Sequence, residues 1–203
     1  MNLPNKLSLL RIILIPVTML FMLPISIYGW EPAGWNAFIA EHGMLIAAIV
    51  FIVASITDFL DGKIARKYNL ITNLGKFLDS LADKMLVIAV LIALVAVGRI
   101  SAWLLAIIVL REFMVTGIRL LASKEGVVMA AKMIGKIKTA TQMIAIIYIM
   151  FEPTLYKAFG IEPSPAGGIS IVGDILFGIC VIMTIISGID YLMNNLKYFK
   201  ESD

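Results

Sequence analysis

Four aspartates lie close together in a chain that is otherwise mostly apolar: Asp58, Asp61, Asp79 and Asp83. At about 100° per residue, the first two lie roughly 60° apart on a helix, and the last two lie roughly 40° apart. Each pair therefore shares one helix face, and two facing helices would bring all four together. Carboxylate oxygens are ligands that Mg²⁺ and Mn²⁺ prefer. Because such a cluster is costly at membrane depth without positive charge, we expect it to hold two divalent cations.

Small residues accompany the first acidic pair. Gly62 and Ala65 fall on the same side of the predicted helix as Asp58 and Asp61. Glycine costs about 1 kcal/mol relative to alanine inside a helix, so close approach of a ligand or of another helix would explain Gly62. For Gly62 and Ala65 alone, helix packing is the simpler interpretation. Arg66 flanks this face and could bind phosphate oxygens.

The composition identifies the class of protein that must position these residues. Of the 203 residues, 61% are hydrophobic, whereas a soluble domain has about 45–50%. The chain is therefore predicted to be an integral membrane protein. The single cysteine, Cys180, excludes an intrachain disulfide and a thiolate metal cluster. The single histidine, His42, makes a histidine-based metal site unexpected.

Six apolar segments are long enough to cross a bilayer, which takes about 20 residues of helix. We expect one all-α domain over residues 1–203, with six transmembrane helices in one bundle and a short interfacial helix at 1–11. Pro16 and Pro24 are predicted kinks in the first span. Residues 29–42 and 152–169 are predicted loops. The predicted spans are 9–28, 44–67, 75–97, 102–122, 133–151 and 171–193.

The basic residues predict the orientation of these spans. Of the 17 Lys and Arg residues, only Arg99 and Lys157 fall in or beside the loops on the side of residues 29–42. Because cytoplasmic loops are enriched in Lys and Arg, both termini are predicted to be cytoplasmic. The segment from Asp58 to Asp83, called the acidic stretch below, is then predicted to face the cytoplasm at the cell membrane. A water-soluble substrate can reach it there.

The acidic stretch resembles the signature of the CDP-alcohol phosphotransferase family. It reads Asp58-x2-Asp61-Gly62-x2-Ala65-Arg66-x8-Gly75-x3-Asp79-x3-Asp83, and all eight defined positions are filled. The resemblance implies that a CDP-linked donor is bound through two divalent cations, and that Asp83 is the general base. It implies metal ligands at Asp58, Asp61, Asp79 and Asp83. It implies a donor site formed by Asp58, Gly62, Ala65, Arg66 and Gly75. The opening segment, residues 2–11, is also similar to the start of enzymes of this family, and it adds Asn5 to the donor site.

Two later segments, Arg111–Arg119 and Lys132–Thr139, resemble the branch of that family that makes phosphatidylglycerophosphate. This resemblance extends to about residue 142. It implies CDP-diacylglycerol as the donor, sn-glycerol 3-phosphate as the acceptor, CMP as the second product, and a homodimer in the lipid bilayer. Independently of the resemblance, cations beside an acidic metal site make sense if the acceptor carries a phosphate. The candidate residues are Arg111, Arg119, Lys136 and Lys138.

Simpler interpretations of these cations also exist. Arg111 could pair with Glu112 or another acid, and the lysines could merely follow the positive-inside rule. Lys136 and Lys138 lie about 200° apart on a helix, so both could reach one phosphate only at a bend or a helix end. Glu112, Lys84 and Asp190 are expected to be structural partners rather than catalytic groups.

Two alternative functions remain open at this point. One is a sister enzyme with another acceptor, such as an inositol phosphate, serine or phosphatidylglycerol. The other is a transporter whose intramembrane aspartates relay cations or protons. Transport gives no reason for the spacing of Gly62, Ala65 and Arg66, and no nucleic-acid partner is expected.

Overall fold

The computed structural model describes residues 3–67, 73–124, 132–164 and 167–195. Within these ranges, the side chains at 3–6, 58–67, 73–80 and 124 lie outside the description. The chain divides into two compact units. The first comprises Met1–Ile100 and Met150–Glu162, and the second comprises Ser101–Ile149 and Pro163–Asp203.

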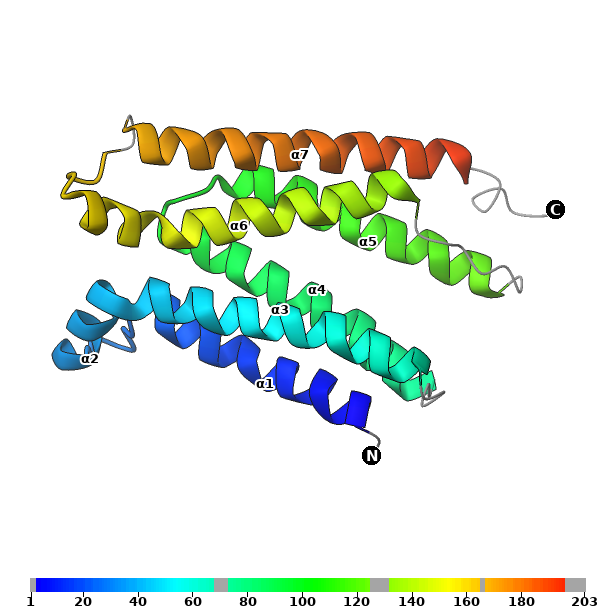
Figure 1. Ribbon diagram of the computed structural model, residues 1–203, viewed down its shortest axis with the longest axis horizontal. Helices are drawn as coiled ribbons and strands as arrows, with labels where there is room; N and C mark the ends of the chain where they lie inside the picture. The colour runs from blue at the N-terminus through cyan, green and yellow to red at the C-terminus, as the bar shows by residue number, and fades with distance from the viewer. Residues whose placement is uncertain (1–2, 68–72, 125–131, 165–166, 196–203) are drawn as a thin grey trace. The chain divides into compact units, whose positions relative to one another are not determined.

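The described residues form helices, and none of them forms a strand (Figure 1). Three helical segments are both long and apolar enough to cross a membrane: Ala33–Thr57, Met133–Phe159 and Gly168–Asn194. This architecture is that of an integral membrane protein, because a helix satisfies all its backbone polar groups internally. The elements are α1 (Leu3–Met22), α2 (Ala33–Phe38), the π-helix η1 (Ile39–Gly43), α3 (Met44–Lys67), α4 (Asn73–Ala96), α5 (Ala102–Lys124), α6 (Met133–Phe159) and α7 (Gly168–Asn194).

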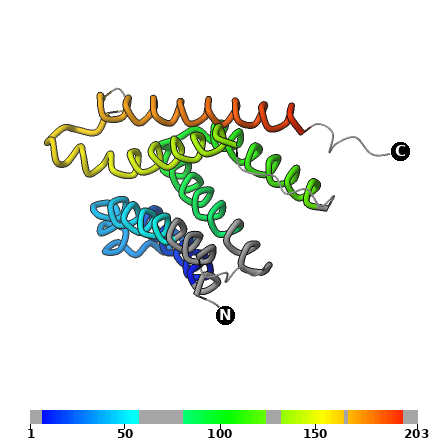
Figure 2. The backbone as a smooth tube through the Cα atoms, turned by 45° about the vertical axis from the view of Figure 1, so that its right-hand side comes forward, coloured from blue at the N-terminus to red at the C-terminus, as the bar shows by residue number. Residues whose placement is uncertain are grey.

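In the first unit, α1 packs against both α3 and α4 (Figures 1 and 2). The chain turns back between α1 and α3 through α2 and η1. Gly43, the last residue of η1, lies so close to α1 that an added Cβ would be 2.2 Å from the Phe21 carbonyl oxygen. The buried core of this unit includes Phe51, Ala54 and Leu86.

In the second unit, α5 packs against α7. A buried cluster joins Val115 and Ile118 of α5 to Tyr191 of α7, with Met114 and Leu192 packed at its edge. The first part of α6 belongs to this unit, and the Tyr148 hydroxyl donates a hydrogen bond to the Ile169 carbonyl of α7 (3.2 Å).

The predicted segment 44–67 is confirmed as α3 with the same bounds. Three other predictions were wrong in part. The interfacial helix and the first span form one helix, α1, which ends at Met22, so Pro24 lies beyond it and only Pro16 lies within it. Part of the predicted loop 29–42 is helical, as α2 and η1.

The third correction concerns α6, which continues to Phe159 through Pro153, where a loop was predicted. The side chains flanking the proline explain this continuation. Glu152 is buried in an ion pair with Arg99, and Tyr156 is buried in the core of the first unit. The stabilisation from these contacts offsets the loss of the backbone hydrogen bond that a proline removes from a helix interior.

Candidate active site

The acidic stretch occupies the end of α3 and the start of α4. Asp61 lies six residues before the end of α3 at Lys67, and Asp79 lies six residues after the start of α4 at Asn73. At about 1.5 Å per residue, each is therefore roughly 9 Å along its helix from the joined ends. Asp58 and Asp83 lie one turn further along. The two pairs of aspartates therefore lie at similar distances from the joined ends of α3 and α4.

The first helix reaches the same end of this unit. Figure 1 shows α1 beginning where α3 ends and α4 begins, and α1 packs against both. Asn5 lies two residues after the start of α1, so it belongs to this end of the helix. The fold brings together the three segments that the sequence assigns to the donor and metal site.

Of the predicted metal and donor residues, Asp83 has a described side chain, and it is exposed. The side chains of Asn5, Asp58, Asp61, Gly62, Ala65, Arg66, Gly75 and Asp79 lie outside the described residues. Their predicted roles stay predictions. The chemistry of the donor set fits a hard divalent cation, because it offers carboxylate oxygens on adjacent turns of two helices and no thiolate or imidazole.

The second unit contains a buried network of charged side chains. The Glu112 carboxylate of α5 accepts hydrogen bonds from Arg111 Nη1 (3.0 Å) and from Lys138 Nζ of α6. Lys138 also donates to Gln142 Oε1, one turn further along α6. The exposed fractions of the side chains are 12% for Arg111, 16% for Glu112 and 3% for Lys138. Two of the four predicted phosphate-binding cations are thereby brought together around one carboxylate.

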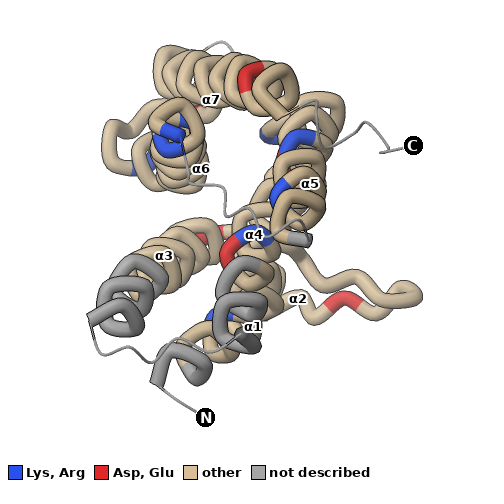
Figure 3. Tube along the Cα trace, turned by 90° about the vertical axis from the view of Figure 1, so that its right-hand side faces the viewer, with Lys and Arg blue, Asp and Glu red and all other residues tan. Residues whose placement is uncertain are grey.

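The other two predicted cations are more accessible. Arg119 and Lys136 are exposed, and Figure 3 shows basic residues on both α5 and α6. Lys136 and Lys138 therefore face different surroundings, as their 200° separation predicts. Glu112 and Asp190 form ion pairs, as expected of structural partners: Glu112 pairs with Arg111 and Lys138, and Asp190 pairs with Lys132 (2.9 Å).

Sequence reasoning missed the residues of α7 that contact the arginines. Ser187 Oγ accepts a hydrogen bond from Arg111 Nε (3.1 Å), and Tyr191 Oη accepts one from Arg119 Nε (3.3 Å). A Cβ added to Gly188 would lie 3.1 Å from Arg111 Cγ. A serine and a glycine in an apolar helix are indistinguishable from packing residues in sequence, so no local signal identified them.

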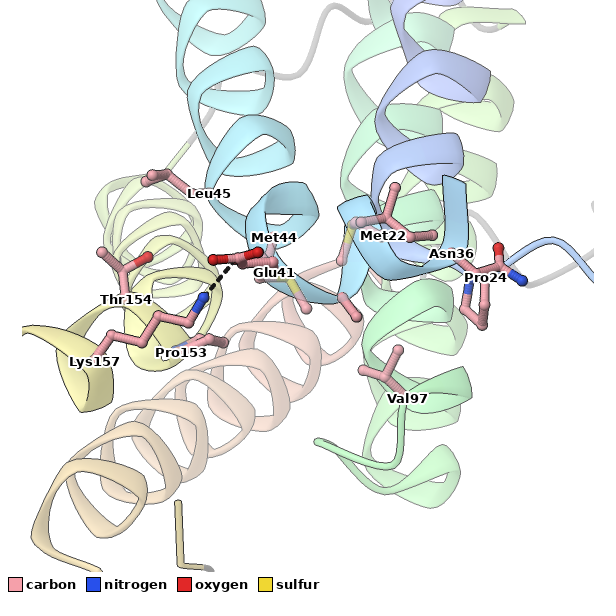
Figure 4. A pocket seen from close by; sticks show the side chains of 12 residues that line it. Met22, Pro24, Asn36, Glu41, Met44, Leu45, Val97, Pro153, Thr154 and Lys157 are labelled. Carbon is pink, nitrogen blue, oxygen red and sulfur yellow. Dashed lines mark hydrogen bonds between the residues drawn. The ribbon is translucent and has the colours of Figure 1, made fainter. Parts of the chain in front are cut away.

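A cavity of about 260 Å³ lies at the opposite end of α3, away from the aspartates (Figure 4). Its walls are mainly apolar, and Lys157 Nζ at its edge donates a hydrogen bond to the Glu41 carbonyl of η1 (2.9 Å). None of the predicted site residues lines it. The lining residues are Met22, Pro24, Asn36, Ile39, Ala40, Glu41, Met44, Leu45, Val97, Pro153, Thr154 and Lys157.

Comparison with known proteins identifies the family of this chain. A CDP-diacylglycerol–glycerol-3-phosphate 3-phosphatidyltransferase of Bacillus subtilis is 42% identical over 202 residues, which cover 100% of this chain and 99% of that protein. Enzymes of the same name from Rickettsia felis and Shigella flexneri are 35% and 33% identical, over 98% and 94% of this chain and 97% and 93% of their own. The model of the family described as CDP-alcohol phosphatidyltransferase matches residues 1–186. The chain belongs to the CDP-alcohol phosphatidyltransferase family.

Proposed function

We propose that this protein transfers the phosphatidyl group of CDP-diacylglycerol to a hydroxyl of sn-glycerol 3-phosphate. The products are phosphatidylglycerophosphate and CMP. The observation that carries the proposal is the full-length similarity to enzymes of that name, which covers nearly all of both chains. The proposal also accounts for the acidic stretch and for the cations of α5 and α6. A transporter would not require this combination of residues.

The donor is assigned to the first unit. Asp58, Asp61, Asp79 and Asp83 would hold two divalent cations, Mg²⁺ or Mn²⁺, and their matching heights on α3 and α4 support this assignment. When bound, such cations polarise phosphoryl oxygens and stabilise charge on the leaving phosphate. Gly62 and Ala65 leave room for the nucleotide, while Arg66, Gly75 and Asn5 complete the donor site.

Asp83 is assigned the proton transfer. A carboxylate within hydrogen-bond reach of the acceptor hydroxyl can remove its proton as the oxygen attacks phosphorus. The exposed position of Asp83 supports this role, because a general base must be reachable by the acceptor. The hydroxyl oxygen forms a bond to phosphorus, the bond from phosphorus to the CMP oxygen breaks, and Asp83 receives the proton.

The acceptor's phosphate is assigned to Arg111, Arg119, Lys136 and Lys138. A phosphate monoester carries nearly two negative charges at neutral pH, and guanidinium groups bind such an anion through paired hydrogen bonds. Arg111 is partly satisfied by Glu112 and Ser187, which hold its guanidinium in one orientation. Serine lacks a phosphate and would leave these cations without their anion.

The number of membrane spans is assigned from the lengths of the helices. The helices α1 and α3–α7 are 20–27 residues long, and about 20 residues span a bilayer. We assign six spans to them, with both termini and the acidic stretch on the cytoplasmic side of the cell membrane. The enzyme is assigned as a homodimer, on the resemblance to its family alone.

The test is an acceptor panel with purified protein, CDP-diacylglycerol and Mg²⁺. We expect CMP release and a new phospholipid with sn-glycerol 3-phosphate, and neither product with serine, inositol phosphate or phosphatidylglycerol. Release of CMP with one of those acceptors, and none with sn-glycerol 3-phosphate, would refute the acceptor assignment.

A second arm of the same assay tests the cations. Chelation by EDTA should abolish CMP release, and added Mg²⁺ or Mn²⁺ should restore it. Activity that persists in EDTA, after dialysis against the chelator, would contradict the metal assignment while leaving the acceptor assignment intact.

A further inference from the structure

Three residues of α7 contact the two arginines of α5. Ser187, Gly188 and Tyr191 lie within roughly 100° of one another on the helix, so they form one stripe. Arg111 and Arg119 lie two turns apart on α5, and each is contacted by this stripe. We propose that the α7 stripe, Ser187, Gly188 and Tyr191, positions both arginines for an anionic phosphate and thereby sets the enzyme's affinity for a phosphorylated acceptor.

The hydrogen bonds of Ser187 have a defined direction. Its hydroxyl donates to the Thr184 carbonyl (3.1 Å), and the same oxygen accepts from Arg111 Nε (3.1 Å). Since the hydroxyl proton is used within α7, a lone pair of the oxygen is directed at the guanidinium. Ser187 is itself 3% exposed, so water does not compete freely for this contact. Arg111 therefore has one donor held by α7, one held by Glu112, and others left for an anion.

Gly188 provides the space for the stem of Arg111. An added Cβ would lie 3.1 Å from Arg111 Cγ and 3.5 Å from Met114 Cε. The contact with Met114 would be an ordinary one, but the approach to Arg111 Cγ is too tight and would shift the stem of the arginine by a few tenths of an ångström. A side chain at this position would therefore move the guanidinium without removing any of its hydrogen-bond partners.

Tyr191 plays the corresponding part for Arg119. Its hydroxyl accepts from Arg119 Nε (3.3 Å), and the Arg119 Cζ atom lies 5.6 Å from the ring centroid. The ring is anchored because Tyr191 is 5% exposed and belongs to the cluster with Val115 and Ile118. An otherwise exposed, flexible arginine is thus held over a fixed aromatic face, where the cation–π attraction favours one orientation.

This inference depends on the proposed function for its acceptor, and its chemistry is that of a phosphate monoester. The stripe residues are positioning residues, because they act through the arginines. They should therefore affect the acceptor's KM more than kcat or the donor's KM, whereas a purely structural role would alter all three or only thermal stability.

The experiment compares full-length variants in lipid nanodiscs that contain CDP-diacylglycerol. Ser187→Ala should raise the KM for sn-glycerol 3-phosphate about tenfold, the loss expected for one hydrogen bond to a charged group. The kcat at saturating acceptor and the donor's KM should stay near their wild-type values. Ser187→Thr keeps the hydroxyl and should restore the acceptor's KM.

Gly188→Ala should raise the acceptor's KM in the same way. Its matched control is Gly178→Ala on the same helix, where an added Cβ would have no atom within 4 Å. Tyr191→Phe should raise the acceptor's KM less than Tyr191→Leu, because phenylalanine retains the ring face.

A binding measurement without turnover completes the test. Inorganic phosphate and sn-glycerol 3-phosphate should each raise the unfolding temperature of the wild type, since both bind the folded state. Ser187→Ala and Gly188→Ala should require higher concentrations of either ligand for the same rise. Unchanged acceptor KM and unchanged ligand protection in these two variants would overturn the inference.

The two proposals fail in different ways. If the wild type releases no CMP with sn-glycerol 3-phosphate, the proposed function is wrong, and the protection by inorganic phosphate still decides whether the stripe positions a phosphate site. If the wild type is active and protected, and the variants have the same acceptor KM and the same protection, only the positioning role of the α7 stripe is wrong. Loss of kcat with unchanged acceptor KM would also contradict the positioning role.

Discussion

Lys136 and Lys138 are lysines two positions apart on α6, and their side chains have different surroundings. The Lys138 side chain is 3% exposed and bonds to Glu112 and Gln142, whereas Lys136 is exposed. A buried ammonium is tolerated only when it is paired and hydrogen-bonded. Lys138 therefore stabilises the network around Glu112, whereas the Lys136 side chain is accessible to an anion from water.

Asp83 provides the sharpest test at the level of one residue. Asp83→Asn preserves the size of the side chain but cannot accept a proton from the acceptor hydroxyl. We expect CMP release to fall by about 100-fold or more, the usual contribution of a general base. Turnover is measured with sn-glycerol 3-phosphate at saturation, and the unfolding temperature is measured in parallel.

The control for this substitution is Glu162→Gln, which removes an exposed carboxylate near the end of the first unit. It should leave both turnover and stability unchanged. Wild-type turnover in Asp83→Asn would show that another group takes the proton.

At the level of the elements, η1 shows how one glycine determines where helices meet. The π-helix Ile39–Gly43 continues directly into α3, and Gly43 is buried against the Phe21 carbonyl of α1. An inserted residue in the helix ladder changes the direction of the side chains around it. The start of α3 is thereby brought against the end of α1, which sets the packing of the helices that carry Asn5 and the first two aspartates.

Gly43→Ala should be strongly destabilising. The added Cβ would lie 2.2 Å from a backbone oxygen and 2.9 Å from Ile39 Cβ, and backbone cannot move aside as a flexible side chain can. We expect the free energy of unfolding to fall by about 2 kcal/mol, the usual cost of overpacking. Reversible denaturation in mixed micelles measures this change.

Gly34→Ala is the matched control in the adjacent helix α2, where an added Cβ would meet nothing within 4 Å. It should be neutral or slightly stabilising, because alanine favours helix over glycine. Equal stability of the Gly43 and Gly34 variants would show that α1 leaves room for a methyl group beside Gly43.

A second contact at this level joins the segment that follows α4 to α6. Arg99 and Glu152 form a two-pronged ion pair, with Nη2–Oε1 at 2.7 Å, and the Glu152 side chain is 4% exposed. Arg99→Met should cost about 3 kcal/mol of unfolding free energy, because it leaves a buried carboxylate without this partner. The double variant Arg99→Met, Glu152→Met should recover much of that loss, and a double-mutant cycle measures the coupling. Additive losses in the cycle would show that the pair contributes no coupling.

At the level of the whole molecule, the spans must alternate across the membrane. We expect the tail after α7 to be cytoplasmic and the segment between α6 and α7 to lie on the opposite side. The single Cys180 is buried, so Cys180→Ala gives a background for site-directed labelling. An impermeant maleimide should label Glu162→Cys in intact cells, and Asp203→Cys only after permeabilisation. Labelling of both sites in intact cells would rule out the six-span arrangement.

Local patterns determined much of this protein in advance. Hydropathy identified the membrane class, because each apolar segment shows its character in its own residues. The bounds of α3 and the placement of each aspartate pair on a helix followed from helical periodicity. The family followed from a spacing of eight positions within one stretch. Where the sequence was misleading, as at Pro153, a local rule was overridden by the packing of Glu152 and Tyr156.

Only the tertiary structure decided which groups satisfy the buried charges. Arg111 and Ser187 are 76 positions apart in the chain, and Arg99 and Glu152 are 53 apart. Nothing in the neighbourhood of Ser187 or Gly188 distinguishes them from packing residues, since their roles arise from the helix that lies against them. Helix formation depends on interactions over three or four residues, which a sequence displays, whereas the partners of a buried cation depend on how whole helices pack.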